Sequence, residues 1–336
     1  MNWRTLQSQP VLGHKWKTAI LGLGSLTAAV LGTILHVGSA QAQEAVRIGL
    51  PAKAYWTTVT TQAAQEQGLF KKEGLAAEVT AYRSSAEAFE ALAAGATDLV
   101  LGPPSLVAGG LTRGVQTKVV AGGANGVFGW YLATAAESKI SSVKDLEGKN
   151  VGMSAAGSVT DLLARWEQQN AKVDFTRVPV GSSGVLPSLL SGNVAAAVIF
   201  PPLSYQVIAE GKVRPLLEFS EKMPPVLFDA WITSDKLIAE KPAIVQKALN
   251  AVFGGLLYVR EHRQYAVKLI SAVHEVPEAV ATKQYEGVVL KLLPDGQFKP
   301  EWITTWLDLA KLGGMTGLAP TDATYTTRFK PVPTRP

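Results

Sequence analysis

The sequence contains no cysteine among its 336 residues. This absence excludes disulfide frameworks, thiol nucleophiles, iron–sulfur clusters and cysteine-based zinc sites. Histidine is scarce and occurs only as His14, His36, His262 and His274, so a histidine-rich metal site is not favoured. We therefore expect no metal and no cofactor. The composition, 47% hydrophobic and 18% charged, is typical of a folded globular chain. Its length corresponds to about two domains.

The sequence also lacks a strong excess of one charge. The whole chain has 32 basic and 27 acidic residues, and three of the basic ones, Arg4, Lys15 and Lys17, precede the first acidic residue, Glu44. Without these three, 29 basic residues stand against 27 acidic ones. A net charge that is so small and so scattered does not favour nucleic-acid binding, and we expect no nucleic acid as a partner.

Residues 1–42 are typical of a secretory signal peptide. Basic residues lead into an apolar stretch over 18–37, and Ala40-Gln41-Ala42 fits a small-x-small cleavage site, which places the mature start near Gln43. No cysteine follows for lipid attachment, and no arginine pair precedes the apolar stretch. The alternative is an uncleaved anchor helix, because the apolar stretch is near the length that spans a bilayer. No other long uncharged apolar run follows, so we expect an exported, soluble mature protein.

From residue 46 onward, short apolar runs alternate with helical patterns, which predicts βα units and mainly parallel sheets. A first set of units covers about 46–121 and a second set about 130–200. We expect a single helix over 57–72, and mainly helices after about residue 229. The proline-rich end, 330–336, is expected to be a loose tail.

A repeated pattern relates the two sets. Ser84-Ser85 is followed by Gly95 and Pro103-Pro104, and Ser182-Ser183 is followed by Gly192 and Pro201-Pro202. The first serine precedes the first proline by 19 residues in both copies, with a helical pattern and an apolar strand in between. We therefore predict two similar α/β lobes, which both direct the start of a helix and the end of a strand toward a shared space.

Ligands of open α/β sheets bind beyond the carboxyl ends of the strands, so the residues that follow the predicted strands are the candidates for a binding site. They are aromatic residues, small residues at helix starts, two prolines, one arginine and one aspartate. The candidates are Tyr55, Trp56, Arg83, Ser84, Ser85, Gly102, Pro103, Ser105, Trp130, Ser154, Gly157, Ser158, Thr160, Ser182, Pro201, Asp229 and Trp231.

Small hydroxyl residues at helix starts predict an anion site, because free backbone N–H groups and the helix dipole attract anions and hydroxyls add donors. The alternative for each serine is ordinary capping of its own helix. The aromatic residues would form flat pocket walls or pack in the core. Asp229 would meet an amine of the ligand or cap the following turn. Arg83 would meet an anionic group of the ligand or lie on the surface.

Catalytic motifs are missing from the sequence. No nucleophile elbow, phosphate-binding loop or dinucleotide fingerprint follows a predicted strand. His262 and His274 fall on C-terminal helices among charged neighbours, which predicts solvated positions for both. We therefore expect a binding protein with no catalytic residues.

Three segments of the sequence form recognisable motifs: QEQGLFKKEGL over 65–75, ALAAGATD over 91–98 and VKDLEGKNVG over 143–152. They resemble segments of the periplasmic substrate-binding proteins of ABC importers, in the branch that serves sulfonates, taurine, nitrate and thiamine pyrimidine precursors. The resemblance extends over about 46–272. It implies a two-lobed, type II periplasmic-binding-protein fold of class α/β. That fold has two mainly parallel sheets flanked by helices, two crossover strands at a hinge, and a ligand cleft between the lobes.

The resemblance places the crossovers near 128–133 and 226–233. Lobe 1 would comprise 43–130 and 230–336, and lobe 2 would comprise 131–229. By position, the first-loop aromatic residue of the family falls on Tyr55 or Trp56. The loop after the third strand falls on 102–105, and the helix start of the second lobe falls on 157–160.

The function implied by the resemblance is that of a periplasmic, monomeric receptor without enzyme activity. It would capture a small organic anion, sulfonate- or taurine-like or nitrate-like, or an aromatic or pyrimidine solute, and deliver it to an ABC permease in the inner membrane. Two alternatives stay open, a periplasmic ligand sensor and an enzyme of the same fold. The pyrimidine-precursor synthases that the fold resembles use a cysteine-rich motif, which this chain lacks.

Overall fold

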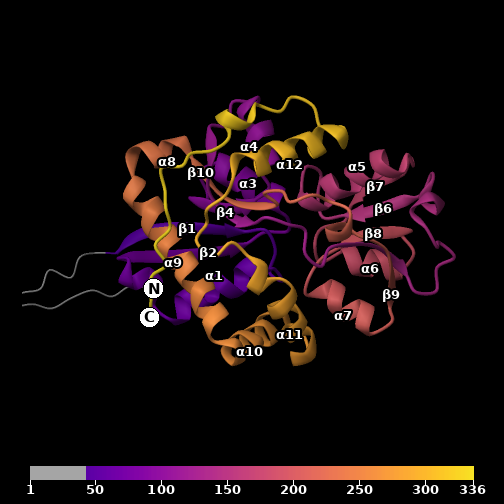
Figure 1. The fold of residues 1–336 in the computed structure, drawn as a ribbon, viewed down its shortest axis with the longest axis horizontal. Coiled ribbons are helices and arrows are strands. Elements are labelled where there is room, and N and C mark those ends of the chain that lie inside the picture. The colour runs from indigo at the N-terminus through magenta and orange to yellow at the C-terminus, as the bar shows by residue number, and fades with distance from the viewer. Residues whose placement is uncertain (1–42) are drawn as a thin grey trace, which may run out of the picture. The chain divides into compact units, whose positions relative to one another are not determined.

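The computed structural model describes residues 43–336, and the predicted signal peptide over 1–42 lies outside the described residues. The strands form two five-stranded sheets, seen at the left and the right of Figure 1. The strand order is β2-β1-β3-β10-β4 in the first sheet and β7-β6-β8-β5-β9 in the second. We call the first sheet with its helices lobe 1 and the second sheet with its helices lobe 2. The lobe boundaries given above stay a prediction.

Both sheets are mixed but mainly parallel, as predicted. The first consists of β1 (Glu44–Leu50), β2 (Leu75–Ala81), β3 (Leu99–Gly102), β4 (Thr117–Ala124) and β10 (Asp229–Ser234). The second consists of β5 (Tyr131–Ala135), β6 (Asn150–Met153), β7 (Thr176–Pro179), β8 (Ala196–Ile199) and β9 (Val213–Glu218). Only β10 in the first sheet and β5 in the second run antiparallel to their neighbours. Each is the strand with which the chain enters its sheet after crossing from the other one.

The two sheets have equivalent strand orders, so the repeated serine and proline pattern marks equivalent places in the two lobes. The serine pairs lie at the starts of α3 (Ser85–Ala93) and α6 (Val185–Leu190). The proline pairs lie at the starts of α4 (Pro104–Leu111) and α7 (Leu203–Ala209). The prediction of two similar α/β lobes is confirmed.

The remaining helices lie mostly in lobe 1. They are α1 (Trp56–Glu66), α2 (Leu69–Lys72), α5 (Val159–Ala171), α8 (Asp235–Glu240), α9 (Pro242–Glu261), α10 (Arg263–His274), α11 (Glu278–Gly287) and α12 (Pro300–Leu312). The prediction of a single helix over 57–72 is wrong. Gly68 adopts φ 66°, a left-handed conformation that suits glycine, so α1 ends and a short new helix, α2, begins.

Helix α9 is the central helix of lobe 1 and packs against α1, β1 and β2. Gly255 allows this close approach, since a Cβ atom there would lie 2.1 Å from the carbonyl oxygen of Thr60. Helix α9 is long and apolar enough to cross a membrane, but 61% of its most apolar 18-residue segment is buried within the protein. Such burial is typical of the core helix of a globular fold.

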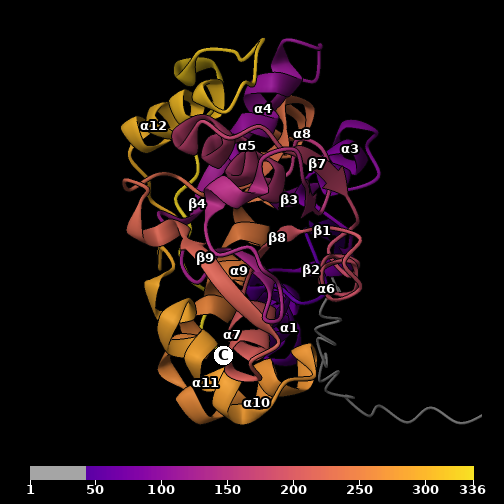
Figure 2. The same cartoon turned by 90° about the vertical axis from the view of Figure 1, so that its right-hand side faces the viewer.

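The lobes also touch on either side of the space between them. Helix α12 of lobe 1 packs against α5 of lobe 2, and α11 packs against α7, as Figure 2 shows. The second contact is close at Tyr205, because a Cβ atom at Gly287 would lie 2.6 Å from its hydroxyl oxygen. These two contacts flank the region where the loops of both sheets meet.

The C-terminal tail is held against lobe 1, so the prediction of a loose tail is wrong. The backbone N–H of Val332 donates to Oδ1 of Asn250 (2.9 Å), and that of Thr334 donates to the carbonyl of Asn250 (3.1 Å). The Thr334 hydroxyl donates to the carboxylate of Glu73, and Phe329 is buried. The tail therefore finds its hydrogen-bond partners on α9 and after α2, which its proline-rich composition does not reveal.

Removal of residues 332–336 should lower the free energy of unfolding by about 2 kcal/mol, because three hydrogen bonds of about 1 kcal/mol or less are lost. Urea denaturation of 43–336 and 43–331, followed by circular dichroism, measures the difference. The control is Arg335→Ala, which removes only an exposed pair with Glu261 and should cost less than about 0.5 kcal/mol. Equal stability of the full and shortened chains would show that the tail contributes nothing.

Candidate functional site

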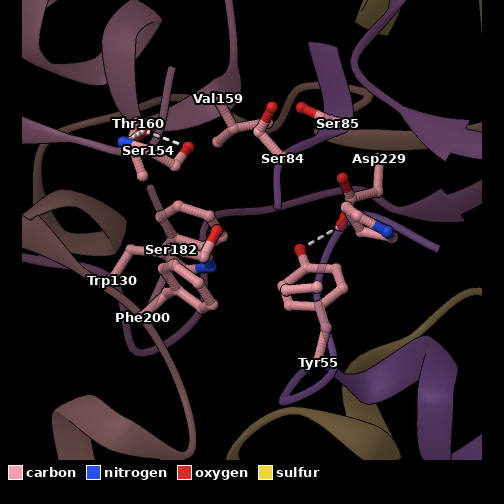
Figure 3. Close-up of a pocket in the computed structure, with 12 residues that line it drawn as sticks. Tyr55, Ser84, Ser85, Trp130, Ser154, Val159, Thr160, Ser182, Phe200 and Asp229 are labelled. Atoms are coloured by element: carbon pink, nitrogen blue, oxygen red, sulfur yellow. Dashed lines mark hydrogen bonds between the residues drawn. The ribbon is translucent and has the colours of Figure 1, made fainter. Parts of the chain in front are cut away.

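A small cavity lies between the lobes, at the carboxyl ends of the strands of both sheets. Its volume is about 30 Å³. Lobe 1 supplies the loops after β1 and β2 and the start of β10, and lobe 2 supplies the loops after β6, β7 and β8. The cavity is lined by Pro51, Ala52, Tyr55, Ser84, Ser85, Trp130, Ser154, Val159, Thr160, Ser182, Phe200 and Asp229 (Figure 3).

Many of the candidate residues meet at this cavity. The candidates that line it are Tyr55, Ser84, Ser85, Trp130, Ser154, Thr160, Ser182 and Asp229. Four lining residues were not among the candidates, namely Pro51, Ala52, Val159 and Phe200. They carry no polar side chain that would single them out in the sequence.

The other candidates lie around the cavity or away from it. Trp231 is 1% exposed, inside the core of lobe 1. The hydroxyl of Ser105 accepts from Nε1 of Trp306 (3.3 Å) and is also internal. The remaining candidates, which do not line the cavity, are Trp56, Arg83, Gly102, Pro103, Gly157, Ser158 and Pro201. Adjacent positions in one loop thus differ in the direction that they face.

Asp229 is the buried carboxylate of the cavity. Its Oδ2 accepts hydrogen bonds from the Tyr55 hydroxyl and from Nε1 of Trp56 (3.2 Å), and Figure 3 shows Tyr55 and Asp229 together on one side. Burial raises the pKa of Asp229 to about 6, although the bonds from Tyr55 and Trp56 act in the opposite direction. No basic side chain among residues 43–336 forms an ion pair with it. Its Oδ1 is therefore suited to a ligand group that donates hydrogen or carries positive charge.

Three hydroxyls form a triangle at the start of α5. Ser154 Oγ lies 2.9 Å from Ser158 Oγ and 2.8 Å from Thr160 Oγ1, and the last two atoms are 2.9 Å apart. The Ser158 hydroxyl donates to the carbonyl of Ala155 (2.7 Å), so its proton is already used. Ser158 also caps α5 by accepting from the N–H of Asp161 (3.5 Å). Ser154 and Thr160 line the cavity, and their hydroxyl protons can turn toward a ligand.

Asp161, which was not among the candidate residues, stabilises the loop that carries this triangle. Asp161 is 1% exposed. Its Oδ2 accepts from the backbone N–H of Gly157 (2.8 Å) and from Nε of Arg165 (3.1 Å), and its Oδ1 pairs with Arg177. The available signal is weak, because an acidic residue in the first turn of a helix is a common stabilising feature.

The serine pairs of the two lobes meet beside the cavity. Ser84 caps α3 by accepting from the N–H of Glu87 (3.1 Å). The backbone N–H of Ser182 donates across the lobes to the carbonyl of Arg83 (3.3 Å), and the Ser182 hydroxyl donates to the same carbonyl. The Arg83 side chain is 80% exposed and pairs with Glu87 (3.2 Å). Arg83 thus contributes its backbone to the contact between the lobes and directs its charge to solvent.

Aromatic rings form the wall opposite Asp229. Trp130 and Phe200 stack with ring centroids 4.8 Å apart, and Tyr55 meets both rings edge-on at 6.2 and 5.8 Å. Trp130 lies on the crossover before β5, and Phe200 follows β8. The cavity is thereby enclosed by flat apolar surfaces on one side and by hydroxyl and carboxylate oxygens on the others.

His274 supports the loop of Tyr55, and the prediction of a solvated His274 is wrong. It is 9% exposed. Its Nε2 lies 3.1 Å from the carbonyl oxygen of Tyr55, and its Nδ1 lies 3.0 Å from Oε1 of Gln284. Burial lowers the pKa of His274. Charged neighbours in the sequence favour an exposed position, but α10 turns this one residue toward the loop after β1.

Comparison with known proteins finds a family model and a curated relative that match the chain. A family model described as NMT1/THI5 like matches residues 58–266. A protein of Brucella abortus (strain 2308), whose name describes it only as a binding protein, is 31% identical over 214 residues. The match covers 62% of this chain and 64% of that protein, so it spans less than two thirds of the length of this relative.

Solved structures show the same fold. The alkanesulfonate-binding protein SsuA from Xanthomonas axonopodis pv. citri, bound to MOPS, has a TM-score of 0.72 and 18% identity, over 84% of this chain and 98% of that chain. The periplasmic nitrate-binding protein NrtA from Synechocystis PCC 6803 has a TM-score of 0.61 and 15% identity, over 73% of this chain and 70% of that chain. The chain therefore has the periplasmic-binding-protein fold.

Proposed function

Because this chain belongs to the NMT1/THI5-like family, we propose that it is the solute-binding component of an ABC importer. It acts in the periplasm after cleavage of residues 1–42, as a monomer and without catalysis. Lobe 1 comprises 43–130 and 230–336, and lobe 2 comprises 131–229. The protein holds a small organic solute between the lobes and delivers it to the permease. The observation that carries the proposal is the cavity to which equivalent loops of both lobes contribute.

The hydroxyl side of the cavity supports an acidic or acceptor group on the solute. Ser154 and Thr160 can donate into the cavity, and the N–H groups at the start of α5 add positive potential. A sulfonate, a carboxylate or nitrate has the matching chemistry. Such a group would replace the mutual hydrogen bonds of the hydroxyls without leaving a donor unpaired.

The carboxylate side supports a donor group on the same solute. Asp229 lacks an ionic partner among the residues described, and a protonated amine or a ring N–H at its Oδ1 would compensate the buried charge. The aromatic wall of Trp130 and Phe200 would contact an apolar part of the solute. Taurine-like and pyrimidine-like solutes combine an acceptor group, a donor group and an apolar part, whereas nitrate has only the acceptor oxygens.

Closure of the lobes follows from the same arrangement. A solute that touches both lobes stabilises the closed form by its differential binding free energy. The contact between Ser182 and the Arg83 carbonyl would form in that state. For delivery, the permease must recognise the closed form and not the open one. A hinge at the two crossovers would give the two forms different surfaces.

A thermal-shift screen tests this proposal on residues 43–336, with taurine, alkanesulfonates, nitrate, aromatic carboxylates and thiamine pyrimidines. A solute at 100 times its Kd should add about 2.7 kcal/mol to the free energy of unfolding. Small-angle scattering should show that the same solute makes the protein more compact. A panel without any shift would contradict the proposed solute classes, and a shift without compaction would contradict closure.

A further inference from the structure

A second hollow adjoins the cavity, and we call it the interlobe groove. Its volume is about 510 Å³, and it shares Ala52, Ser182 and Phe200 with the cavity. Apolar side chains of both lobes line it, among them Tyr82 and Val276 of lobe 1 and Leu186 and Leu203 of lobe 2. The groove is therefore continuous with the proposed site and lies between the same two lobes.

The charged residues of the interlobe groove are already paired. Lys53 pairs with Glu275 (3.1 Å), and both side chains are more than 70% exposed. Arg83 pairs with Glu87 and points to solvent. What the groove presents to a ligand is thus mainly apolar surface. A contiguous apolar hollow of this kind on a globular protein is typical of a binding site.

The cavity is much smaller than the interlobe groove, and this difference limits which part of a solute each can hold. A single water molecule needs a cavity volume of roughly 10–15 Å³, so the cavity of about 30 Å³ holds a polar group of only a few atoms. Binding sites for organic ligands usually have about 300–1,000 Å³, a range that includes the groove and excludes the cavity. The cavity by itself is too small for an organic solute, and the groove offers the remaining space.

We propose that the interlobe groove is a second subsite, which binds the apolar body of an amphiphilic solute whose polar head enters the cavity. This inference rests on the proposed function and narrows it. Nitrate, which has no apolar body, would use the cavity alone and bind weakly. A body in the groove would contact Tyr82 and Val276 on one side and Leu186 and Leu203 on the other, so it would also favour closure of the lobes.

Calorimetry with probes of equal head and unequal body tests the inference. Ethanesulfonate is compared with hexanesulfonate, and propanoate with heptanoate, on residues 43–336. Each buried methylene is worth roughly a three- to fourfold gain in affinity. The longer member of a pair, with four more methylenes, should bind about 10- to 100-fold more tightly, with the lower value for a body that is partly buried.

Two variants on α6 locate the body of the probe. Leu186→Ser places a hydroxyl in the groove and should reduce the gain of hexanesulfonate over ethanesulfonate to less than about threefold. Leu190→Ser, one turn later on the same helix, is the matched control, because Leu190 is 47% exposed and does not line the groove. Leu203→Ser repeats the test from α7. Circular dichroism and the melting temperature show whether each variant is folded.

The outcomes separate this inference from the proposed function. Equal binding of short and long probes would overturn the subsite and leave the proposed function in place. A length-dependent gain that both Leu186→Ser and Leu203→Ser leave intact would place the body elsewhere and also overturn the subsite. If no probe binds the wild-type protein, a sulfonate or carboxylate head does not fit the cavity and the inference is overturned, while the thermal-shift screen with the other solutes decides the proposed function separately. A gain that only the groove variants remove is the expected result.

Discussion

Asp229→Asn should raise the free energy of unfolding at pH 7.5 by about 3 kcal/mol. The carboxyl group has a pKa of about 6 in the folded protein against an ordinary value of 3.8, because it is buried without a cation. Each unit of difference corresponds to about 1.4 kcal/mol. An asparagine oxygen can accept the same bonds from Tyr55 and Trp56, so the variant loses the charge and keeps the contacts. Urea denaturation of residues 43–336 measures the effect.

The dependence on pH gives the sign of this prediction. The folded wild-type protein binds the proton of Asp229 more tightly than the unfolded chain does. The ionised carboxylate therefore does not lower the free energy of unfolding at about pH 3 and below, lowers it increasingly as the pH rises toward 6, and lowers it by a constant amount above about pH 7. The stability gained by Asp229→Asn should shrink to about 0.5 kcal/mol at pH 4 and disappear near pH 3, because the other titrating groups are the same in both proteins.

The control for this prediction is Asp308→Asn, since Asp308 is 59% exposed and only pairs with Lys311 on the surface. Its effect should be below about 1 kcal/mol. If Asp229→Asn destabilises the protein at pH 7.5, the buried charge is not a cost. Asp229 would then not need a hydrogen-donating or cationic group of the solute to compensate its charge.

Ser154→Ala combined with Thr160→Val should weaken the binding of hexanesulfonate by 100-fold or more. Each hydroxyl would donate to a charged oxygen, and such a bond is worth about 1.5–3 kcal/mol. The two together correspond to at least about 3 kcal/mol. Calorimetry at pH 7.5 measures the change. Valine keeps the shape of threonine, but it removes the acceptor of the Ser154 backbone N–H (2.8 Å), so the melting temperature is measured alongside to show that the loop is retained.

Ser158→Ala separates ligand binding from helix capping. Its hydroxyl donates to Ala155 and caps α5, and it does not line the cavity. We expect it to lower stability by about 1 kcal/mol and to leave the affinity for hexanesulfonate within about threefold of wild type. Equal losses of affinity in Ser158→Ala and in the double variant would mean that the triangle acts only by shaping the loop.

The sequence determined the elements and their repetition, because those signals are local. The alternation of short apolar runs with helical patterns from residue 46 onward predicts the strands and helices of both lobes as βα units. Ser84 and Ser158 are N-caps, as residues of that type at helix starts predict. The repeated serine and proline pairs anticipate two equivalent sheets. Periodicity and capping act within a few residues, so one chain without its fold contains them.

Which side chains face the cavity depends on the tertiary structure. Trp130 and Trp231 both lie at strands next to the crossovers, yet the first lines the cavity and the second is inside lobe 1. Ser154 and Thr160 line the cavity, while Ser158 between them does not. A loop has no fixed period, so the direction of each side chain depends on the backbone path, which distant contacts such as that of Asp161 with Arg177 hold in place.

The pairings that give the site its chemistry are also long-range. Asp229 accepts its hydrogen bond from Tyr55, 174 positions away, and His274 reaches the Tyr55 carbonyl across 219 positions. No local pattern links such residues, because sheet order and helix packing bring them together. The residue types already present in the sequence supplied a carboxylate, hydroxyls and aromatic rings. Their meeting at one cavity, with an apolar groove beside it, follows from the packing of two lobes whose contacts join distant parts of the chain.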